Sequence, residues 1–353
     1  MYQIDTSAAN FPEADDYVRG FFLYVDPDHE AMVALYRVTV ARTLAALRAG
    51  WAFPTIDQLM PRNVEHLRDM FYQEQQGGAR EMVDAETKIA SFPDVYFRLR
   101  EVLDRPTSSA DDVADVVGTD VALTAKLLKL VNSPLYAFAE PIDSVSHAVS
   151  LLGVREVSNL ALGISTINFF KDIPPELIDM RTFWKHSLSV GIFSKLLAAR
   201  VRGANTERLF TAGLLHDVGR LILFKKLPYA STQALIHARS NMLPVVDAET
   251  DVFGYDHTNV GQTLLAAWNF PQEMTDLVRF HHTPMQAPIP LDAAIVQVAD
   301  NLANAAEIPA GGKFVLPGLA PGAWELLGLG PDSIEPLMEL YDLHIEEVTE
   351  TFL

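Results

Sequence analysis

Apolar residues recur at intervals of three to four along most of this chain, which is the spacing of helices that bury one face. Residues 29–48 follow the pattern closely, and Gly50 is the expected stop of that helix. Residues 110–131 follow it with one interruption at Gly118, which predicts two short helices. A last helix is expected over about 332–352. The sequence therefore predicts an all-α protein with short connections.

Extended structure is expected to be minor. Only residues 21–25 and 313–316 could form strands, and neither segment alternates over a long run. Residues 308–313 and 317–318, rich in Pro and Gly, are expected to be irregular.

The 353 residues are enough for about two domains. A boundary is expected near residues 75–78, which read Gln-Gln-Gly-Gly. Residues 1–80 would then be a small, mostly helical extension, to which we assign no family. A denser helical region is expected to reach about residue 306, and residues 307–353 to pack on it as a loop and helices.

The composition excludes several classes of protein. Because 49% of the residues are apolar and 21% are charged, the chain can bury enough surface to fold. A formal net charge of -19 argues against binding to duplex nucleic acid or to an anionic membrane. The most apolar stretch, 159–170, is too short to span a bilayer.

The chain contains no cysteine, which excludes disulfides, thiol catalysis and zinc sites built on thiolates. This composition fits a reducing cytosol. The N-terminus also lacks the basic start and apolar run of a secretory signal. We therefore expect a cytoplasmic protein without a membrane anchor.

Imidazole and carboxylate groups are the candidates for chemistry. Together, and without thiolates, they form the ligand set of Zn, Mn, Fe or Ni. The seven candidates are His186, His216, Asp217, His257, His281, His282 and Asp300.

His216 and Asp217 are expected inside one buried helix that begins after an N-cap at Thr206. A buried His-Asp pair is costly unless it is hydrogen-bonded or binds an ion. His186 is expected to open an apolar helix, and His257 to start another.

Three of the candidates have ordinary alternative roles. His281 and His282 end a predicted helix just before Pro284, where histidines also cap helices. Asp300 lies in an apolar helix and could instead cap a neighbouring one. The remaining histidines have no supporting ligand pattern: His29, His66, His147, His237 and His344.

Four segments carry a resemblance to a known family. They read LLKLVNSPLY (127–136), SVSHAVSLLGVRE (144–156), GLLHDVGRL (213–221) and WNFPQEMT (268–275). With the ordered histidines and aspartates they resemble the HDOD family, a branch of the HD metal-dependent phosphohydrolases. The resemblance covers about residues 88–305. It implies an all-α bundle of two packed subdomains, 88–170 and 171–306, of which the second is HD-like.

The resemblance also implies roles for the candidate residues. In the related two-metal HD-GYP phosphodiesterases, the positions that match all seven candidates are metal ligands. Asp217 would bridge two ions and Arg220 would orient a phosphate. Two departures are evident: Arg220 stands where HD hydrolases usually have Lys, and no Gly-Tyr-Pro segment follows His282.

Two functions follow from the resemblance. Many HDOD proteins are bacterial signalling or regulatory modules, which favours a non-catalytic module with a protein partner and, as a further option, a nucleotide or phosphate ligand. The intact ligand set favours the alternative, a metal-dependent phosphohydrolase. In either case we expect His186, His216, Asp217 and Asp300 to converge on one ion. We expect the other three histidines to form a second half-site, with two ions ~3.5–4 Å apart when both are bound.

Overall fold

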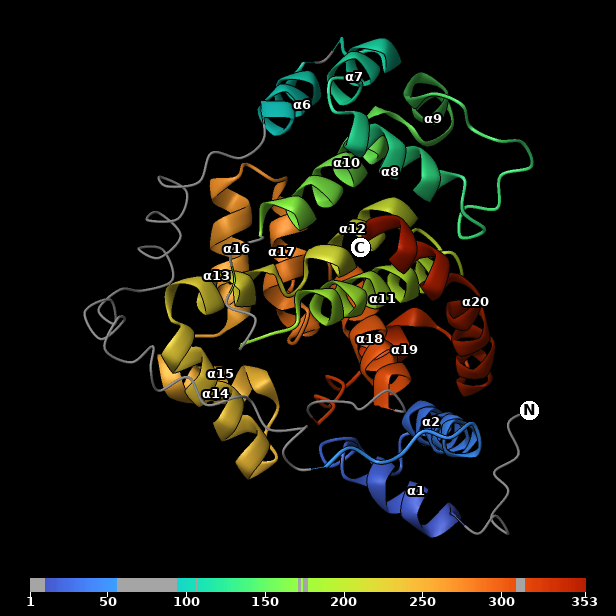
Figure 1. Ribbon diagram of the computed structural model, residues 1–353, viewed down its shortest axis with the longest axis vertical. Helices are drawn as coiled ribbons and strands as arrows, with labels where there is room; N and C mark the ends of the chain where they lie inside the picture. Colours follow the sequence, from blue (N-terminus) through green and yellow to red (C-terminus); the bar gives the residue numbers. More distant parts are fainter. Residues whose placement is uncertain (1–9, 56–93, 106, 171–172, 174–176, 309–314) are drawn as a thin grey trace.

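The computed structural model describes residues 10–55, 94–105, 107–170, 173, 177–308 and 315–353 (Figure 1). Within these ranges the regular structure is entirely helical. The all-α fold predicted from the apolar spacing is therefore confirmed. No helix in the described ranges combines the length and apolar character needed to cross a membrane.

A group of five helices lies at the top of Figure 1. It consists of α6 (Asp94–Asp104), α7 (Ala110–Val117), α8 (Val121–Val131), α9 (Val145–Leu152) and α10 (Val154–Phe169). Gly118 caps the end of α7, so the predicted break between two short helices is confirmed. Ser109, Asp120 and Ser144 each accept a backbone N–H and start the helix that follows.

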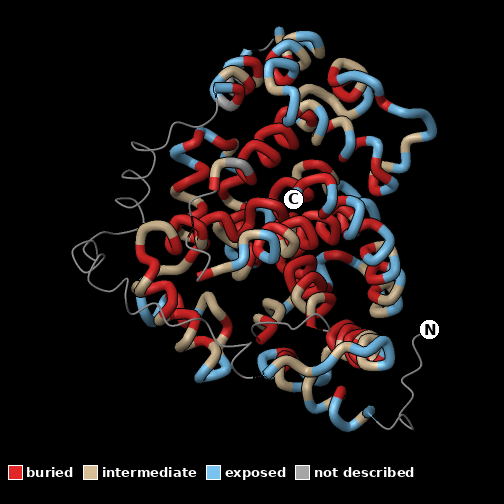
Figure 2. The backbone as a smooth tube through the Cα atoms, in the orientation of Figure 1, coloured by how far each residue is buried: buried red, intermediate tan, exposed pale blue. Residues whose placement is uncertain are grey.

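A second group of helices surrounds α11 (Met180–Ala198), most of whose side chains are buried (Figure 2). The other members are α12 (Thr206–Leu215), α13 (Val218–Lys226), α14 (Pro228–Asn241), α15 (Val245–Phe253), α16 (His257–Ala267), α17 (Gln272–Phe280) and α18 (Pro290–Glu307). Helix α11 packs against α12 and α18, and α10 packs against α12. The contact between α10 and α12 joins the two groups.

The two ends of the chain lie against this second group. Helices α1 (Phe11–Arg19) and α2 (Glu30–Arg48) pack on each other, and α2 also contacts α18 and α20 (Ile334–Phe352). The short α19 (Ala323–Leu327) packs on α18. Single 3-10 turns cover Pro284–Gln286 and Pro331–Ser333.

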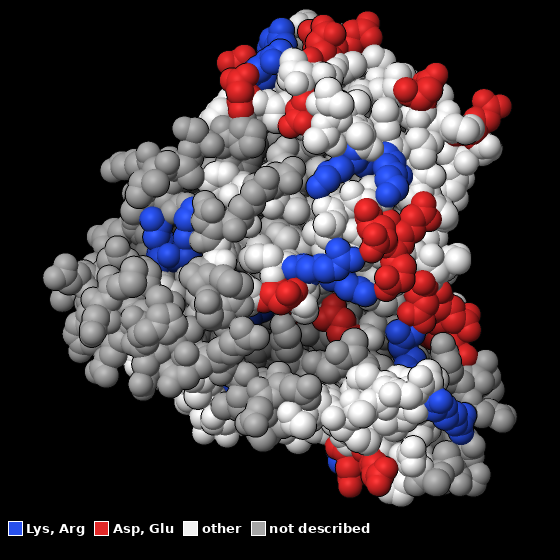
Figure 3. Space-filling model, viewed as in Figure 1, with Lys and Arg blue, Asp and Glu red and all other residues white. Residues whose placement is uncertain are grey.

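Ion pairs line the outer face of α20. Its acidic side chains Asp342, Glu346 and Glu350 pair with Arg42, Lys185 and Arg181, respectively. Figure 3 shows acidic side chains gathered along this edge of the molecule, next to basic ones. Water screens these exposed pairs, so each contributes little to the stability of the protein.

A buried polar cluster links the two helical groups. The Tyr136 hydroxyl, in the segment after α8, donates to Glu207 of α12, which also pairs with Lys195 of α11. The Lys195 ammonium lies 3.6 Å from the centre of the Tyr136 ring. Burial lowers the pKa of Lys195, although Glu207 opposes this change. Burial and the Glu207 charge raise the pKa of Tyr136 well above its usual value.

Several expectations about local structure are wrong. Residues 21–25 form turns rather than a strand. The N-cap of α12 is Asn205, not Thr206, and its side chain accepts from the Arg208 N–H. Both residue types cap helices well, so the sequence alone could not choose between them. His186 does not open α11, because the helix begins six residues earlier at Met180, capped by Asp179.

Other expectations fall on residues that the structure does not describe. These are the boundary at 75–78, residues 313 and 314 of the segment 313–316, and most of the irregular segment 308–313. Residues 315 and 316 are described and form no strand. Residues 317–318 are irregular, as expected. The backbone N–H of Leu316 donates to the carbonyl of Phe21 at 2.8 Å, so the two segments expected to be extended meet at this bond.

Candidate metal centre

The centre is built around a break between two helices. Helix α12 ends at Leu215, His216 is its C-cap, and Asp217 is the N-cap of α13. The expectation that His216 and Asp217 lie inside one helix is therefore wrong. The break matters because it turns both side chains toward the same buried space, where each is less than a tenth exposed.

A first group of donor atoms comes from α11, the end of α12, and α18. Nε2 of His186 lies 3.3 Å from Oδ1 of Asp300, and Nε2 of His216 lies 3.9 Å from the same oxygen. All three donor atoms lie within 4.8 Å of one another. Ligands that are each about 2.0–2.3 Å from one ion can be up to ~4.6 Å apart, so this spacing suits a shared ion.

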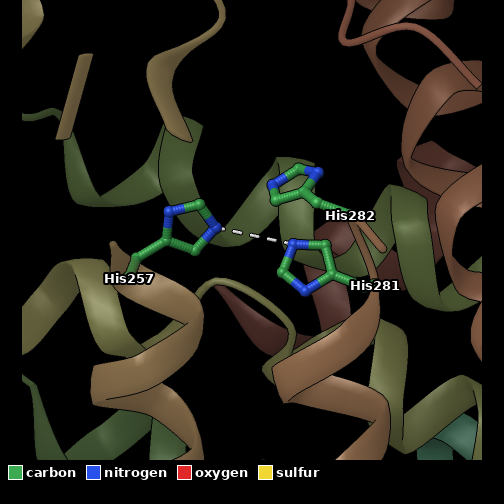
Figure 4. Close-up of side chains that lie close together, drawn as sticks. All are labelled: His257, His281 and His282. Atoms are coloured by element: carbon green, nitrogen blue, oxygen red, sulfur yellow. Dashed lines mark hydrogen bonds between the residues drawn. The ribbon is translucent and has the colours of Figure 1, made fainter. Parts of the chain in front are cut away.

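A second group consists of His257, His281 and His282. Figure 4 shows the three rings facing one another, with His257 from the start of α16 and the other two from the end of α17. Their donor atoms also lie within 4.8 Å of one another, and the Nε2 atoms of His257 and His281 are 3.5 Å apart. His281 is the C-cap of α17 as well, so its capping position and its place in the group coexist.

Asp217 lies between the two groups. Its Oδ1 atom is 3.1 Å from Nε2 of His257 and 3.6 Å from Nε2 of His216. It also forms a third set of nearby donors with His216 and His281. The structure thus brings all seven candidate residues together, but it groups Asp217 with both halves rather than with the first alone.

In four of the histidine rings, the Nδ1 atom contacts a group outside the cluster. Nδ1 of His216 contacts the Gly213 carbonyl at 2.8 Å, and Nδ1 of His281 contacts the Val278 carbonyl at 2.9 Å. These contacts turn the Nε2 atoms of both rings toward the centre. Hydrogen bonds of this kind fix the orientation and tautomer of metal-binding histidines.

Three residues that sequence reasoning missed complete this outer layer. Glu249 of α15 contacts Nδ1 of His257 at 2.5 Å, and Glu307 contacts Nδ1 of His186 at 3.2 Å. Asn304 donates to Oδ1 of Asp300 at 2.7 Å. Asn304 and Glu307 lie one and two turns after Asp300 on α18, a spacing that could have identified them. A single Glu in α15 gave no comparable signal.

Burial and neighbouring charges divide the imidazoles into two kinds. Burial lowers the pKa of His216, and burial together with the neighbouring histidines lowers the pKa of His281 well below its usual value and that of His282 to about 4. Burial acts the same way on His257, but Glu249 and Asp217 outweigh it and raise its pKa to about 9. Glu307 and Asp300 likewise raise the pKa of His186 well above its usual value.

The carboxylates of the centre stay ionised. Burial alone would raise the pKa of Asp217, but His216 and Arg220 outweigh it and hold that pKa well below the usual range. Burial also opposes ionisation of Asp300, and the hydrogen bond with His186 lowers its pKa despite this. The two ionised carboxylates and the three imidazoles with lowered pKa values are in the form that binds a cation.

Arg220 is engaged with carboxylates. Its Nη1 atom donates to Oδ2 of Asp217 at 3.0 Å, and its Nε atom lies 3.7 Å from Oε1 of Glu249. The Arg220 guanidinium therefore contacts both Asp217, which lies between the two donor groups, and Glu249, which contacts the His257 ring. It also lines the cavity over the centre, whose volume is about 60 Å³.

The chemistry of the donor set fits a divalent ion. Nδ1 of His282 is buried and has no hydrogen-bond partner among the described residues. An unpaired buried nitrogen is costly, and an ion or a water molecule would satisfy it. The groups that could hold an ion, within the described residues, all come from these seven side chains.

The other histidines lie apart from the centre. His29, His147 and His237 are near the carboxylates of Glu325, Asp143 and Asp251, respectively. His344 is buried in α20, and His66 lies outside the described residues.

Comparison with known proteins places this geometry in context. A solved structure of an HDOD domain protein with unknown function from Geobacter sulfurreducens is 26% identical, covers 78% of this chain and 98% of its own, and has a TM-score of 0.62. A structure from Shewanella amazonensis SB2B, provisionally named a phosphohydrolase, is 20% identical with a TM-score of 0.61. It covers 79% of this chain and 100% of its own, and it is similar in fold.

Comparison of amino-acid sequences also identifies a relative and a family. An uncharacterized protein of Treponema pallidum (strain Nichols) is 26% identical over 212 residues, or 60% of this chain. The chain spans about 40% of the length of that relative. The model of the HDOD domain matches residues 89–284, more than half of the chain. This chain therefore belongs to the HDOD family.

Proposed function

We propose that this chain is a bacterial signal-transduction protein whose HD-like site holds one or two divalent metal ions without turning over a substrate. The observation that carries the proposal is the convergence of seven imidazole and carboxylate side chains in one buried space. A purely structural role would leave the buried Nδ1 atom of His282 without a partner among the described residues, which is costly.

The donor types favour Fe, Mn, Ni or Zn over Mg or Ca, because imidazoles predominate. In this proposal His186, His216 and Asp300 hold one ion, and His257, His281 and His282 hold a second. Asp217 contacts both. Glu249, Glu307 and Asn304 orient the ligands through their hydrogen bonds.

Two observations favour a regulatory role over catalysis. Arg220, the residue expected to orient a phosphate, is engaged with Asp217 and Glu249. The cavity over the centre, about 60 Å³, is also far smaller than the ~300–1,000 Å³ typical of sites for drug-sized ligands. A cavity of this volume is too small to enclose a cyclic dinucleotide.

Phosphohydrolase activity is the second candidate, and the position of Asp217 between the two donor groups favours it. Two bound metal ions would supply Lewis acidity toward a phosphate oxygen. Asp217 would hold both halves of the site at a fixed separation, and Arg220 would contact the phosphate through the part of its fork that faces the cavity.

The rest of the proposal concerns organisation and partners. We assign residues 88–306 to the HDOD domain, 307–353 to helices packed on it, and 1–80 to an extension that adjusts its contacts. The net charge of -19 favours a protein partner with a basic surface over duplex nucleic acid. A cytoplasmic location fits a chain without cysteine.

Metal titration tests the proposal. Protein stripped with a chelator and titrated at about pH 8, where free imidazole is neutral, should bind more than one equivalent of Mn, Fe, Ni or Zn. Asp217→Ala should lower the number of ions bound, whereas Asp143→Ala at the surface should not. One equivalent would reject the two-ion form, and none would reject the proposed function.

A further inference from the structure

A larger cavity lies beside the candidate metal centre. Its volume is about 380 Å³, within the range of sites for small organic ligands. Four residues line both this cavity and the small one over the centre: Pro244, Val246, His282 and Pro317. A molecule in the larger cavity would therefore lie directly next to His282 and to any ion that the centre holds.

A cation with spare donors lines the larger cavity. Arg279, on the last turn of α17, donates from Nη1 to the Thr258 hydroxyl at 2.7 Å. Among the described residues, no carboxylate pairs with this guanidinium, although Asp247 and Asp256 line the same cavity. Arginine presents five N–H donors in a fixed fork that matches the oxygens of a phosphate, so most of its capacity here is unused.

The two acids of the cavity differ in their availability. The Asp256 carboxylate caps α16, where it accepts from the Thr258 and Asn259 backbone N–H groups and from the Thr258 hydroxyl. Asp247 has no such structural task in α15, and its oxygens can accept from a hydroxyl or N–H group of a ligand. The wall thus offers both a donor for an anion and an acceptor for a polar organic group.

The N-terminal extension supplies part of the wall. Tyr24 is 44% exposed, and it lines the cavity together with residues from the HDOD domain and from the segment after α18. Its position is fixed by the bond between Leu316 and Phe21 and by the approach of Gly318, where a Cβ atom would lie 2.5 Å from the Tyr24 carbonyl. An aromatic ring in a partly open cavity offers a flat apolar surface to a ligand.

We propose that this cavity binds a small phosphorylated molecule that carries hydroxyl or N–H donors, with Arg279 as the phosphate contact and Tyr24 as a residue that sets specificity. The proposal deepens the proposed function, because it names the ligand of the site next to the metal centre. It also gives residues 21–25, which lie outside the matched family region, a direct part in recognition.

Binding measurements on the full chain test this proposal. The probes are the four common nucleoside 5′-monophosphates and glucose 6-phosphate, each compared with its unphosphorylated counterpart by calorimetry. At least one phosphorylated probe should bind with saturation, and its counterpart should bind more weakly. Arg279→Gln should weaken binding by about 10- to 100-fold, the usual effect of losing a charge-assisted contact.

Matched variants separate this effect from a change in net charge or in folding. Arg202→Gln removes an exposed arginine that does not line the cavity, and it should bind like the unaltered protein. Tyr24→Ala should weaken binding and change the order of preference among the probes. Tyr24→Phe keeps the aromatic ring and should retain both the affinity and the order of preference of the unaltered protein. Circular dichroism checks that each variant is folded.

The outcomes distinguish this inference from the proposed function. Metal content is measured on the same samples, so a protein without metal contradicts the proposed function whether or not it binds a probe. Saturable binding that Arg279→Gln weakens and Arg202→Gln does not supports the cavity, with or without metal. The inference is overturned if no phosphorylated probe binds with saturation, or if Arg279→Gln and Arg202→Gln bind equally well.

Discussion

The Oδ1 atom of Asp217 lies 3.1 Å from Nε2 of His257, although the two residues begin different helices, α13 and α16. The contact depends on a close approach of those helices at Gly219. A Cβ atom on Gly219 would lie 2.0 Å from the His257 carbonyl oxygen and 2.5 Å from the Gly261 nitrogen. Gly219 thus controls how closely the two donor groups can approach each other.

Gly219→Ala should therefore destabilise the protein and separate the two groups. Overpacking of this kind typically costs about 1–3 kcal/mol, and the backbone contact places this site at the upper end. Urea denaturation gives the stability, and metal analysis gives the number of ions bound. Gly20→Ala is the control, because its Cβ would meet only ordinary contacts, and a change within about 0.5 kcal/mol is expected. Equal stabilities of the two variants would contradict the packing argument.

Glu249→Gln should weaken metal binding without removing a ligand. The carboxylate holds Nδ1 of His257 and raises the pKa of that ring, so it orients the ring and makes it a stronger donor. Loss of such a partner typically costs about 10- to 100-fold in metal affinity. Competition with a chelator of known affinity measures the change. Glu350→Gln, at an exposed pair with Arg181, should have no effect. A similar loss in both variants would exclude a specific role for Glu249.

Stability of the metal-free protein should be greatest near pH 6.5, the ordinary pKa of histidine. His282, with its pKa lowered to about 4, takes up a proton less readily when folded than when unfolded. Its contribution is therefore present above pH 6.5 and is lost as the pH falls toward 4. His257, with its pKa raised to about 9, behaves in the opposite way. Its contribution is present below pH 6.5 and is lost as the pH rises toward 9.

Thermal unfolding in the presence of a chelator, from pH 4 to pH 9, measures this profile. His282→Gln should flatten the acid side and leave the alkaline side unchanged. A midpoint that rises steadily across the whole range would show that these histidines do not control the pH dependence.

The buried Lys195–Glu207 pair gives a prediction about stability away from the centre. Lys195→Met leaves the Glu207 carboxylate buried with only the Tyr136 and Thr206 hydroxyls as side-chain partners, and should cost about 3–5 kcal/mol. Lys195→Met combined with Glu207→Leu removes both charges and should cost less than the single change. Chemical denaturation of the two variants tests this order. A double variant less stable than the single one would contradict it.

Cyclic di-GMP should not be hydrolysed by the manganese- or iron-loaded protein. The chain lacks a Gly-Tyr-Pro segment after His282, Arg220 is engaged with two carboxylates, and the cavity over the centre is small. Product formation is measured by chromatography, with Asp217→Ala as the control. Metal-dependent hydrolysis that disappears in Asp217→Ala would overturn the regulatory proposal and establish the enzyme. Binding without hydrolysis would support a sensor.

The apolar spacing predicted the helices over residues 29–48, 110–131 and 332–352 well, because each of these buries one face. It could not locate the break at His216, since the pattern of apolar residues continues from α12 into α13. The seven candidate residues were assembled through the family resemblance, because their spacing along the chain does not reveal that they meet. Asp300 lies beyond the matched region 89–284, yet it joins His186 and His216.

The residues around the candidates were harder to predict. A glutamate on an amphipathic helix usually faces water, so nothing in the sequence distinguishes Glu249 from its exposed counterparts. Its role depends on the turn between α15 and α16, which brings the Glu249 carboxylate against His257. The same holds for Tyr24, whose importance depends on contacts with a segment near the other end of the chain.

The hydrogen bond between Phe21 and Leu316 has a consequence for how the protein is made. Tyr24 leaves the ribosome well before Pro317, yet both residues line the same cavity. Domains fold in order of synthesis, so helices α11 to α17 can pack before that cavity exists. Its wall closes only after residues 316–318 have been made, and a chain that stalls before residue 316 carries an unfinished site.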